Sequence, residues 1–216
     1  MDKKFFREKF YDKSNSALVA TEDQSWGDCI ARLYREEVEK TGRKFLHDDY
    51  VDFMIKEVDG WINGEYKSCL MMGGIGVGKT ALMKSLMRLF DELRSPVTIP
   101  PIRCRPVAYY DASDLCEMYI ANEGIRYEVT HCKVLFIDDV GYEANKYFLF
   151  GNVMAPIHDI LLSRYSSRLP TILATNLNLQ EFTVRYGKRV CDRVNELYAI
   201  ILCPERESYR KMPFTI

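Results

Sequence analysis

The sequence lacks a long hydrophobic run, and its N-terminus lacks the features of a secretion signal. No apolar run approaches the roughly 18 residues needed to cross a bilayer. The N-terminal segment, Met1 to Arg7, is charged and contains no apolar core of secretory length. We therefore expect no attachment to a membrane and a location in the cytoplasm.

Metal-ligating patterns are also missing. The seven cysteines are dispersed along the chain without a C-x-x-C pair. The three histidines, His47, His131 and His158, share no ligand spacing. We therefore expect no zinc site, and we expect reduced, buried thiols of the kind found in cytoplasmic proteins.

The chain has no excess of charge of either sign, because 30 lysines and arginines oppose 31 aspartates and glutamates. This balance excludes a molecule that is basic overall, but a local basic patch would be enough to bind nucleic acid. One stretch combines seven basic residues with four acidic ones, and the basic residues are Arg185, Lys188, Arg189, Arg193, Arg206, Arg210 and Lys211. A nucleic-acid patch and an ordinary solvated face both remain open.

The most informative motif present is GGIGVGKT, residues 73–80, which fits the phosphate-binding loop G-x-x-x-x-G-K-[ST]. An apolar strand precedes it and a helix with apolar residues every three or four positions follows it, so a plain glycine-rich turn is the weaker interpretation. In such a loop Lys79 lies against the β- and γ-phosphates and Thr80 gives its hydroxyl to Mg²⁺. The expected nucleotide contacts are Gly74, Ile75, Gly76, Val77, Gly78, Lys79, Thr80 and Ala81.

Polar residues follow two further buried strands. Asp138 and Asp139 end the apolar run VLFI, where we expect Asp138 to hold Mg²⁺ and Asp139 to activate the attacking water. Asn176 ends the run TILAT, where its amide can contact the γ-phosphate or that water. The carboxyl ends of parallel strands meet at one edge of a sheet, so these side chains are expected to gather there.

The pattern of apolar residues predicts an α/β fold with five parallel strands covered by helices on both faces. The expected strands are residues 68–72, 106–110, 133–137, 170–175 and 197–203. The expected helices are residues 27–40, 49–63, one directly after the P-loop, one capped by Ser113 and ending near Gly124, 153–165, and one opened by the capping box of Asn178 and Glu181. Residues 141–151 are expected to form a loop.

Four segments together, GGIGVGKT, VLFIDDVG, TILATN and RYGKRVCDRVNE, resemble the AAA+ ATPases and, among them, the DnaC/IstB-like helicase loaders. The resemblance implies a P-loop NTPase core of three αβα layers that uses ATP and Mg²⁺. It makes Asn176 the first sensor and Arg193 the arginine finger that a neighbouring protomer supplies, with Arg189 as the second choice. Only thirteen residues follow Cys203, so we expect the helical lid domain of many AAA+ proteins to be absent.

The resemblance also implies a function in DNA replication. We expect residues 46–216 to form the ATPase domain and residues 1–45 to form an extension that can bind a partner. The expected partners are a DnaB-like replicative helicase, single-stranded DNA and further copies of the chain. The helix after Ser113 and the loop 141–151 are candidate DNA contacts. An IstB-like transposition helper and a nucleotide-dependent interaction module with little turnover remain as alternatives.

Overall fold

Five parallel strands form the centre of the molecule, in the order β2-β3-β6-β1-β7. The fold is known from a computed structural model, which describes residues 3–10, 25–93, 106–149 and 151–208. The strands are β1 (Ser68–Met72), β2 (Val107–Asp111), β3 (Val134–Val140), β6 (Thr171–Thr175) and β7 (Tyr198–Leu202). The predicted five-stranded parallel sheet is therefore confirmed, with strand ends within three residues of those expected.

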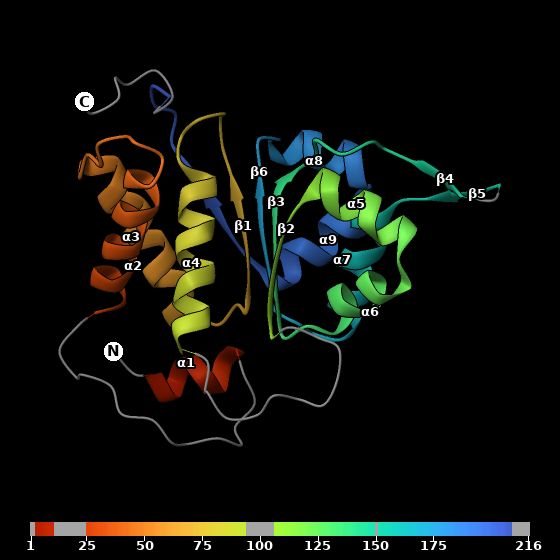
Figure 1. Cartoon of the computed structure of the whole chain (residues 1–216), viewed down its shortest axis with the longest axis horizontal. Helices are drawn as coiled ribbons and strands as arrows, with labels where there is room; N and C mark the ends of the chain where they lie inside the picture. The colour runs from red at the N-terminus through yellow and green to blue at the C-terminus, as the bar shows by residue number, and fades with distance from the viewer. Residues whose placement is uncertain (1–2, 11–24, 94–105, 150, 209–216) are drawn as a thin grey trace.

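Helices cover both faces of this sheet, as Figure 1 shows. One face carries α1 (Lys3–Phe10), α2 (Trp26–Glu39), α3 (Asp49–Asn63) and α4 (Lys79–Leu93). The other carries α5 (Ala112–Ala121), α6 (Glu123–His131), α7 (Pro156–Ser166), α8 (Leu179–Tyr186) and α9 (Lys188–Leu197). None of the helices in these ranges combines the length and hydrophobicity that crossing a bilayer requires.

Successive residues of the central strands supply two separate cores, because side chains alternate across a sheet. Cys69 and Met71 of β1 pack with α2, α3 and α4, whereas Leu70 and Met72 pack on the opposite face. All six cysteines within the described residues are buried and free, while Cys104 lies outside them. Burial raises the pKa of the Cys116 thiol to about 12 and that of Cys203 to about 11.

The N-terminal helices belong to the first of these cores. The Phe6 ring lies 4.7 Å from the Phe90 ring and 4.9 Å from the Trp26 ring, measured between centroids. Lys9 Nζ donates hydrogen bonds to the carbonyls of Trp61, Ile62 and Gly64, at 2.7, 2.8 and 2.8 Å. These carbonyls lie at the end of α3, where the helix supplies few further N–H groups, and of the three only Trp61 O accepts the Gly64 N–H, at 3.2 Å. The lysine therefore fastens α1 to the C-terminal end of α3.

The helix after β2 differs from the expectation. Asp111, not Ser113, is the N-cap of α5, because its carboxylate accepts the Ser113 N–H at 2.8 Å. Gly124 does not end that helix. It lies in the first turn of α6, where Asn122 Oδ1 accepts its N–H at 2.8 Å. An Asn that caps a new helix thus divides what the sequence suggested was one segment.

The segment expected to be a loop, residues 141–151, contains part of an antiparallel hairpin. Strands β4 (Tyr147–Leu149) and β5 (Asn152–Met154) pair with Phe148 opposite Val153. The helix expected from residue 153 therefore begins later, at Pro156, whose fixed φ suits the first helical position. The hairpin projects beyond the rest of the molecule (Figure 1).

The strand register brings the polar residues to one edge of the sheet. Met72, which ends β1, pairs with Thr175, which ends β6. Val140 at the end of β3 pairs with the same Thr175, and Asp111 pairs with Asp138. The P-loop, the aspartate pair and Asn176 therefore leave neighbouring strands side by side.

Candidate active site

The P-loop backbone turns sharply between β1 and α4. The Gly73 N–H donates to Thr175 O at 3.2 Å, which joins the start of the loop to β6. Gly76 has a φ of +80° and Gly78 a φ of +104°, conformations that side chains other than glycine rarely adopt. Helix α4 then begins at Lys79. The unbonded N–H groups of its first turn make this end of the helix a site for an anion.

Lys79 connects the P-loop to β6. Its side chain is 6% exposed, and its Nζ donates to Gly73 O, Gly74 O and Asn176 Oδ1, each at 2.7 Å. The structure thus brings together two residues predicted separately and 97 positions apart in the chain. A phosphate oxygen would give this ammonium a charge-assisted hydrogen bond, which is stronger than one to a neutral carbonyl.

Asp138 lies behind the loop with both carboxylate oxygens engaged. It is 3% exposed; Oδ1 accepts the Asp139 N–H at 2.9 Å and Oδ2 accepts the Tyr109 hydroxyl at 2.7 Å. Burial and the negative charge of Asp138 raise the pKa of Tyr109, so the phenol stays protonated and donates. Nothing in the sequence indicated that Tyr109 contacts this site, because the contact depends on β2 lying beside β3.

Asp139 has an unusual backbone. Its φ is +51°, and the pairing of β3 with β6 shifts register between Ile137 and Val140, on either side of the aspartate pair. A residue other than glycine costs on the order of 1 kcal/mol in this region, and such strain concentrates at functional sites. The bend interrupts the alternation of side chains along β3, and the Asp139 side chain lines the pocket described next.

A pocket of about 380 Å³ opens on the P-loop. One wall holds residues predicted from the sequence: Ile75, Gly76, Gly78, Lys79, Thr80, Ala81, Asp139 and Asn176, joined by Lys84 of α4. The opposite wall holds residues that were not predicted: Glu37, Val38, Lys40, Thr41 and Arg43. Hydroxyl and carboxylate oxygens at Thr80 and Asp139, with Asp138 behind them, are the donors that Mg²⁺ prefers. The pocket therefore suits a phosphate chain with its metal ion.

Four predicted site residues do not line this pocket: Gly74, Val77, Asp138 and Arg193. Val77 is 2% exposed and packs into the core beneath the loop, so it can contact a nucleotide only through its backbone. The Arg193 guanidinium donates to Tyr165 Oη at 3.0 Å and to Glu196 Oε2 at 3.3 Å, and it lies over the Tyr165 ring. Arg189, one turn earlier, is exposed and nearer the end of α9 that leads back to α8.

The segment after β7 crosses the outside of the P-loop, and we name residues 203–208 the C-terminal strap. The Cys203 N–H donates to Met72 O at 2.7 Å. At Gly76 the strap is so close that an added Cβ would clash with Ser208 Oγ. Tyr209, Arg210 and Lys211, which continue the strap in sequence, lie outside the described residues.

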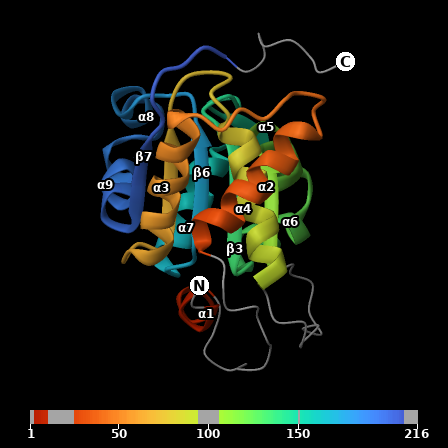
Figure 2. The same ribbon diagram turned by 90° about the vertical axis from the view of Figure 1, so that its left-hand side faces the viewer.

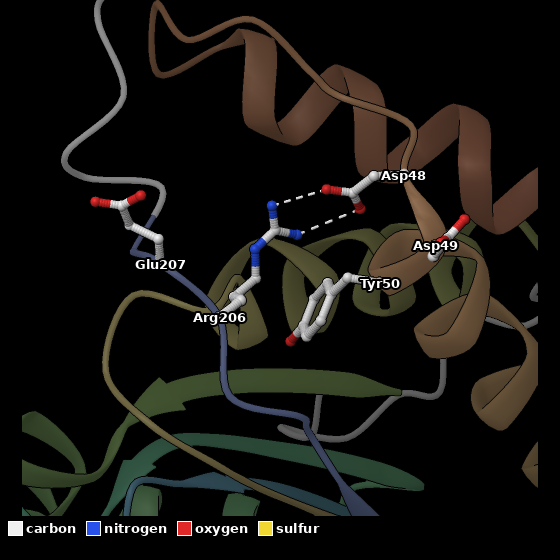
Figure 3. A pocket seen from close by; sticks show the side chains of 5 residues that line it. All are labelled: Asp48, Asp49, Tyr50, Arg206 and Glu207. Carbon is white, nitrogen blue, oxygen red and sulfur yellow. Dashed lines mark hydrogen bonds and ion pairs between the residues drawn. The ribbon is translucent and has the colours of Figure 1, made fainter.

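Arg206 fastens the strap to the beginning of α3 (Figure 3). Its guanidinium contacts Asp48 at 2.9 and 3.4 Å and lies over the Tyr50 ring, 4.5 Å from the centroid. Asp48 is also the N-cap of α3, where its Oδ1 accepts the Val51 N–H at 3.0 Å. One carboxylate therefore starts a helix and holds the strap that lies on the P-loop.

We expect Arg206→Gln to weaken nucleotide binding by roughly fivefold, because a partly buried ion pair contributes about 1 kcal/mol. The loss follows from a strap that no longer holds the Gly76 turn in place. Titration of a fluorescent ATP analogue measures it. Asp48→Asn is the matched variant, since asparagine caps a helix as well as aspartate does but carries no charge. Unchanged affinity in both variants would show that the strap and the nucleotide are independent.

Comparison with solved structures identifies the fold. The chain superposes on the DnaC helicase loader with a TM-score of 0.55 and 19% identity, over 79% of this chain and 98% of that one. It superposes with a TM-score of 0.54 on a Streptococcus pyogenes serotype M3 protein described as a primosome component, at 16% identity over 85% and 97% of the two chains. The chain has the AAA+ fold.

A solved structure that contains a nucleotide analogue has the same fold. The AMPPCP-bound DnaA from Aquifex aeolicus matches with a TM-score of 0.54 and 16% identity, over 77% of this chain. The match spans half of the DnaA chain. No family model matches the sequence, and no curated protein matches it. The assignment of the fold therefore rests on the likeness to solved structures.

Proposed function

We propose that this protein binds and hydrolyses ATP with Mg²⁺ in the pocket between the P-loop and α2. The observation that carries the proposal is the contact between Lys79 and Asn176 in a pocket that also contains Asp139. One cavity thus contains a positive charge that can bind the phosphates, a carboxylate that can accept a proton from water, and an amide that can orient the water or the phosphate. These are the groups that hydrolysis of a phosphoanhydride requires.

The residues divide the reaction between them. Lys79 and the loop N–H groups hold the β- and γ-phosphates, and Thr80 with Asp138 holds Mg²⁺, which neutralises the phosphate charge when bound. Water attacks the γ-phosphorus, the bond to the bridging oxygen breaks, and the Asp139 carboxylate takes the water proton. Asn176 orients the water or the γ-phosphate. In an assembly, Arg193 of a neighbouring copy adds positive charge to the same phosphate.

We propose further that this ATPase loads a DnaB-like replicative helicase onto single-stranded DNA. The support is the shared fold with the DnaC helicase loader over nearly all of that chain, together with the motif resemblance. Residues 46–216 supply the ATPase domain, to which α2 and the turn after it add the second wall of the pocket, and residues 1–45 also supply the partner contact. Self-association through the ATP interface and a cytoplasmic location belong to the same proposal.

Co-purification with the host's replicative helicase tests this role. The helicase should be retained in the presence of ATP and released or loaded when single-stranded DNA is added. ATP binding without any helicase retention would contradict the loader role. Retention of a transposase instead would favour the transposition helper, and retention of another protein with negligible turnover would favour the interaction module.

We expect single-stranded DNA to bind more tightly as ATP and protein concentration rise, and more weakly as salt rises. The chain has a net charge of −1, so one copy can neutralise few phosphates, whereas an assembly aligns several basic faces. Fluorescence anisotropy with a labelled oligonucleotide measures this. Binding that ignores ATP would contradict it.

The hairpin offers a matched pair of variants for the same measurement. Phe148 is 76% exposed at β4, and an aromatic ring can stack on a base. Phe148→Ala should weaken DNA binding about tenfold, since stacking contributes roughly 1–3 kcal/mol per base. Val184 of α8 is 82% exposed and offers no ring, so Val184→Ala is the control.

A further inference from the structure

The wall of the pocket that faces the P-loop comes from the end of α2 and the turn after it. Figure 2 shows α2 crossing in front of α4, with the following chain passing on to the start of α3. Arg43 lies in this connection and lines the same pocket as Thr80, Asp139 and Asn176. Those three residues mark the part of the pocket where the γ-phosphate, its metal ion and the attacking water belong in the proposed function.

This wall is held firmly against α4 and the P-loop. Arg88 of α4 contacts Glu36 at 2.7 Å and Glu37 at 2.8 Å. Tyr34 Oη donates to Gly78 O at 3.5 Å, and its ring packs edge-on against the Phe45 ring at 5.5 Å between centroids. The chain is therefore anchored on both sides of Arg43, which fixes where its side chain can reach.

Two cations lie on this wall, and they differ in exposure and in the donors that they present. Lys40 has a 58% exposed side chain, and its Nζ is 2.5 Å from Glu37 Oε1. Arg43 is half-buried, and one of its contacts runs from Nη1 to Thr41 Oγ1 at 3.3 Å. A guanidinium is always protonated and presents paired donors that match two phosphate oxygens. Arg43 is thus the cation on this wall suited to a phosphate.

We infer that Arg43 is a catalytic residue that contacts the γ-phosphate within its own chain. The inference rests on the proposed ATP hydrolysis and adds a charge that needs no neighbouring copy. As the water oxygen bonds to the γ-phosphorus and the bridging oxygen leaves, Arg43 stabilises the negative charge on the γ-phosphate oxygens. It transfers no proton, because the water proton goes to Asp139.

Nucleotide affinities test where Arg43 points. Arg43→Ala should weaken ATP binding about tenfold and leave ADP binding unchanged, because only ATP carries the γ-phosphate. Arg43→Lys should recover part of the ATP affinity. Arg32→Ala is the control, since Arg32 lies on α2, outside the pocket lining, with a 46% exposed side chain, and pairs with Glu36 and Glu92. Equal losses for ATP and ADP, or no loss, would overturn the inference.

Measurements of turnover show whether Arg43 acts on the nucleotide of its own chain or on that of a neighbouring copy. Arg43→Ala should lower kcat about 100-fold, less than the roughly 10³-fold or more that an arginine finger supplies in GTPases, because Lys79 remains on the phosphate. Mixing Arg43→Ala with Asp139→Asn protein should restore nothing, since neither chain then has a complete pocket. Restored turnover would place Arg43 at a neighbour's site and overturn the inference.

Two controls keep these outcomes distinct. If wild-type protein binds neither ATP nor ADP, the proposed function fails, whatever Arg43 does. If Arg43→Ala does not fold, as judged by circular dichroism, Arg43→Gln repeats both measurements with a side chain of similar length and no charge. Wild-type ATP affinity and turnover in a folded Arg43→Gln variant would equally overturn the inference.

Discussion

Replacing Lys79 with alanine should abolish measurable ATP binding, with a loss in affinity on the order of 100-fold or more. The ammonium is the buried cation of the loop, held at 2.7 Å from two loop carbonyls and from Asn176 Oδ1. Hydrogen bonds between a charged donor and phosphate are about twice as strong as neutral ones. The ammonium of Lys79 can donate several such bonds, so its removal costs all of them at once. The loss should therefore exceed that of any other single substitution in the loop.

Isothermal titration with ATP measures this loss, and thermal unfolding checks the fold. Lys56 of α3 is exposed, so Lys56→Ala removes a lysine without touching the pocket. The Lys79→Ala protein also leaves Asn176 Oδ1 without its donor, which is why its melting temperature must be compared with that of wild type. A folded Lys79→Ala protein that binds ATP with wild-type affinity would refute the P-loop assignment.

Asp138 and Asp139 should respond differently to the same change, although they are adjacent. Asp139→Asn should bind ATP and Mg²⁺ normally and lose turnover by about 10²- to 10⁴-fold, because an amide cannot accept the proton of the attacking water. Asparagine also tolerates the positive φ of this position, so the fold should be kept. ATP hydrolysis measured by phosphate release, next to ATP affinity, gives both values.

Asp138→Asn should weaken Mg²⁺-dependent binding and also lower stability. Both oxygens of Asp138 accept hydrogen bonds, from the Asp139 N–H and from the Tyr109 hydroxyl. An amide can accept only one of them and turns its NH₂ toward the other donor, at a cost of about 1–3 kcal/mol. Tyr109→Phe removes one of these bonds without changing charge and should fall between wild type and Asp138→Asn. Wild-type turnover in both aspartate variants would show that Asp138 and Asp139 have no catalytic role and only end the strand.

Patterns local in the sequence predicted the sheet and one wall of the pocket. Buried strands read as apolar runs, and Asp138, Asp139 and Asn176 follow such runs directly. The register between the strands then placed them together. Errors arose where short polar residues compete for one role, as when Asp111 rather than Ser113 caps α5. The hairpin after β3 was missed because its strands have three residues each.

The second wall of the pocket could not be predicted in the same way. Arg43 lines the pocket because α2 packs on α4, and ion pairs such as the one between Glu37 and Arg88 contribute to that packing. Arg206 meets Asp48 across 158 positions of sequence. Neither pairing leaves a motif, since any charged residue at those positions would look like part of a solvated surface.

Cys203 provides a chemical probe of whether the C-terminal strap stays on the P-loop. Its thiol is 7% exposed where the strap begins, and its pKa of about 11 leaves almost no thiolate at neutral pH. We therefore expect thiol-specific reagents to label it only if the strap separates from the P-loop. The labelling rate of the peptide that contains Cys203 would measure such separation, and we expect a nucleotide that holds the loop to lower that rate.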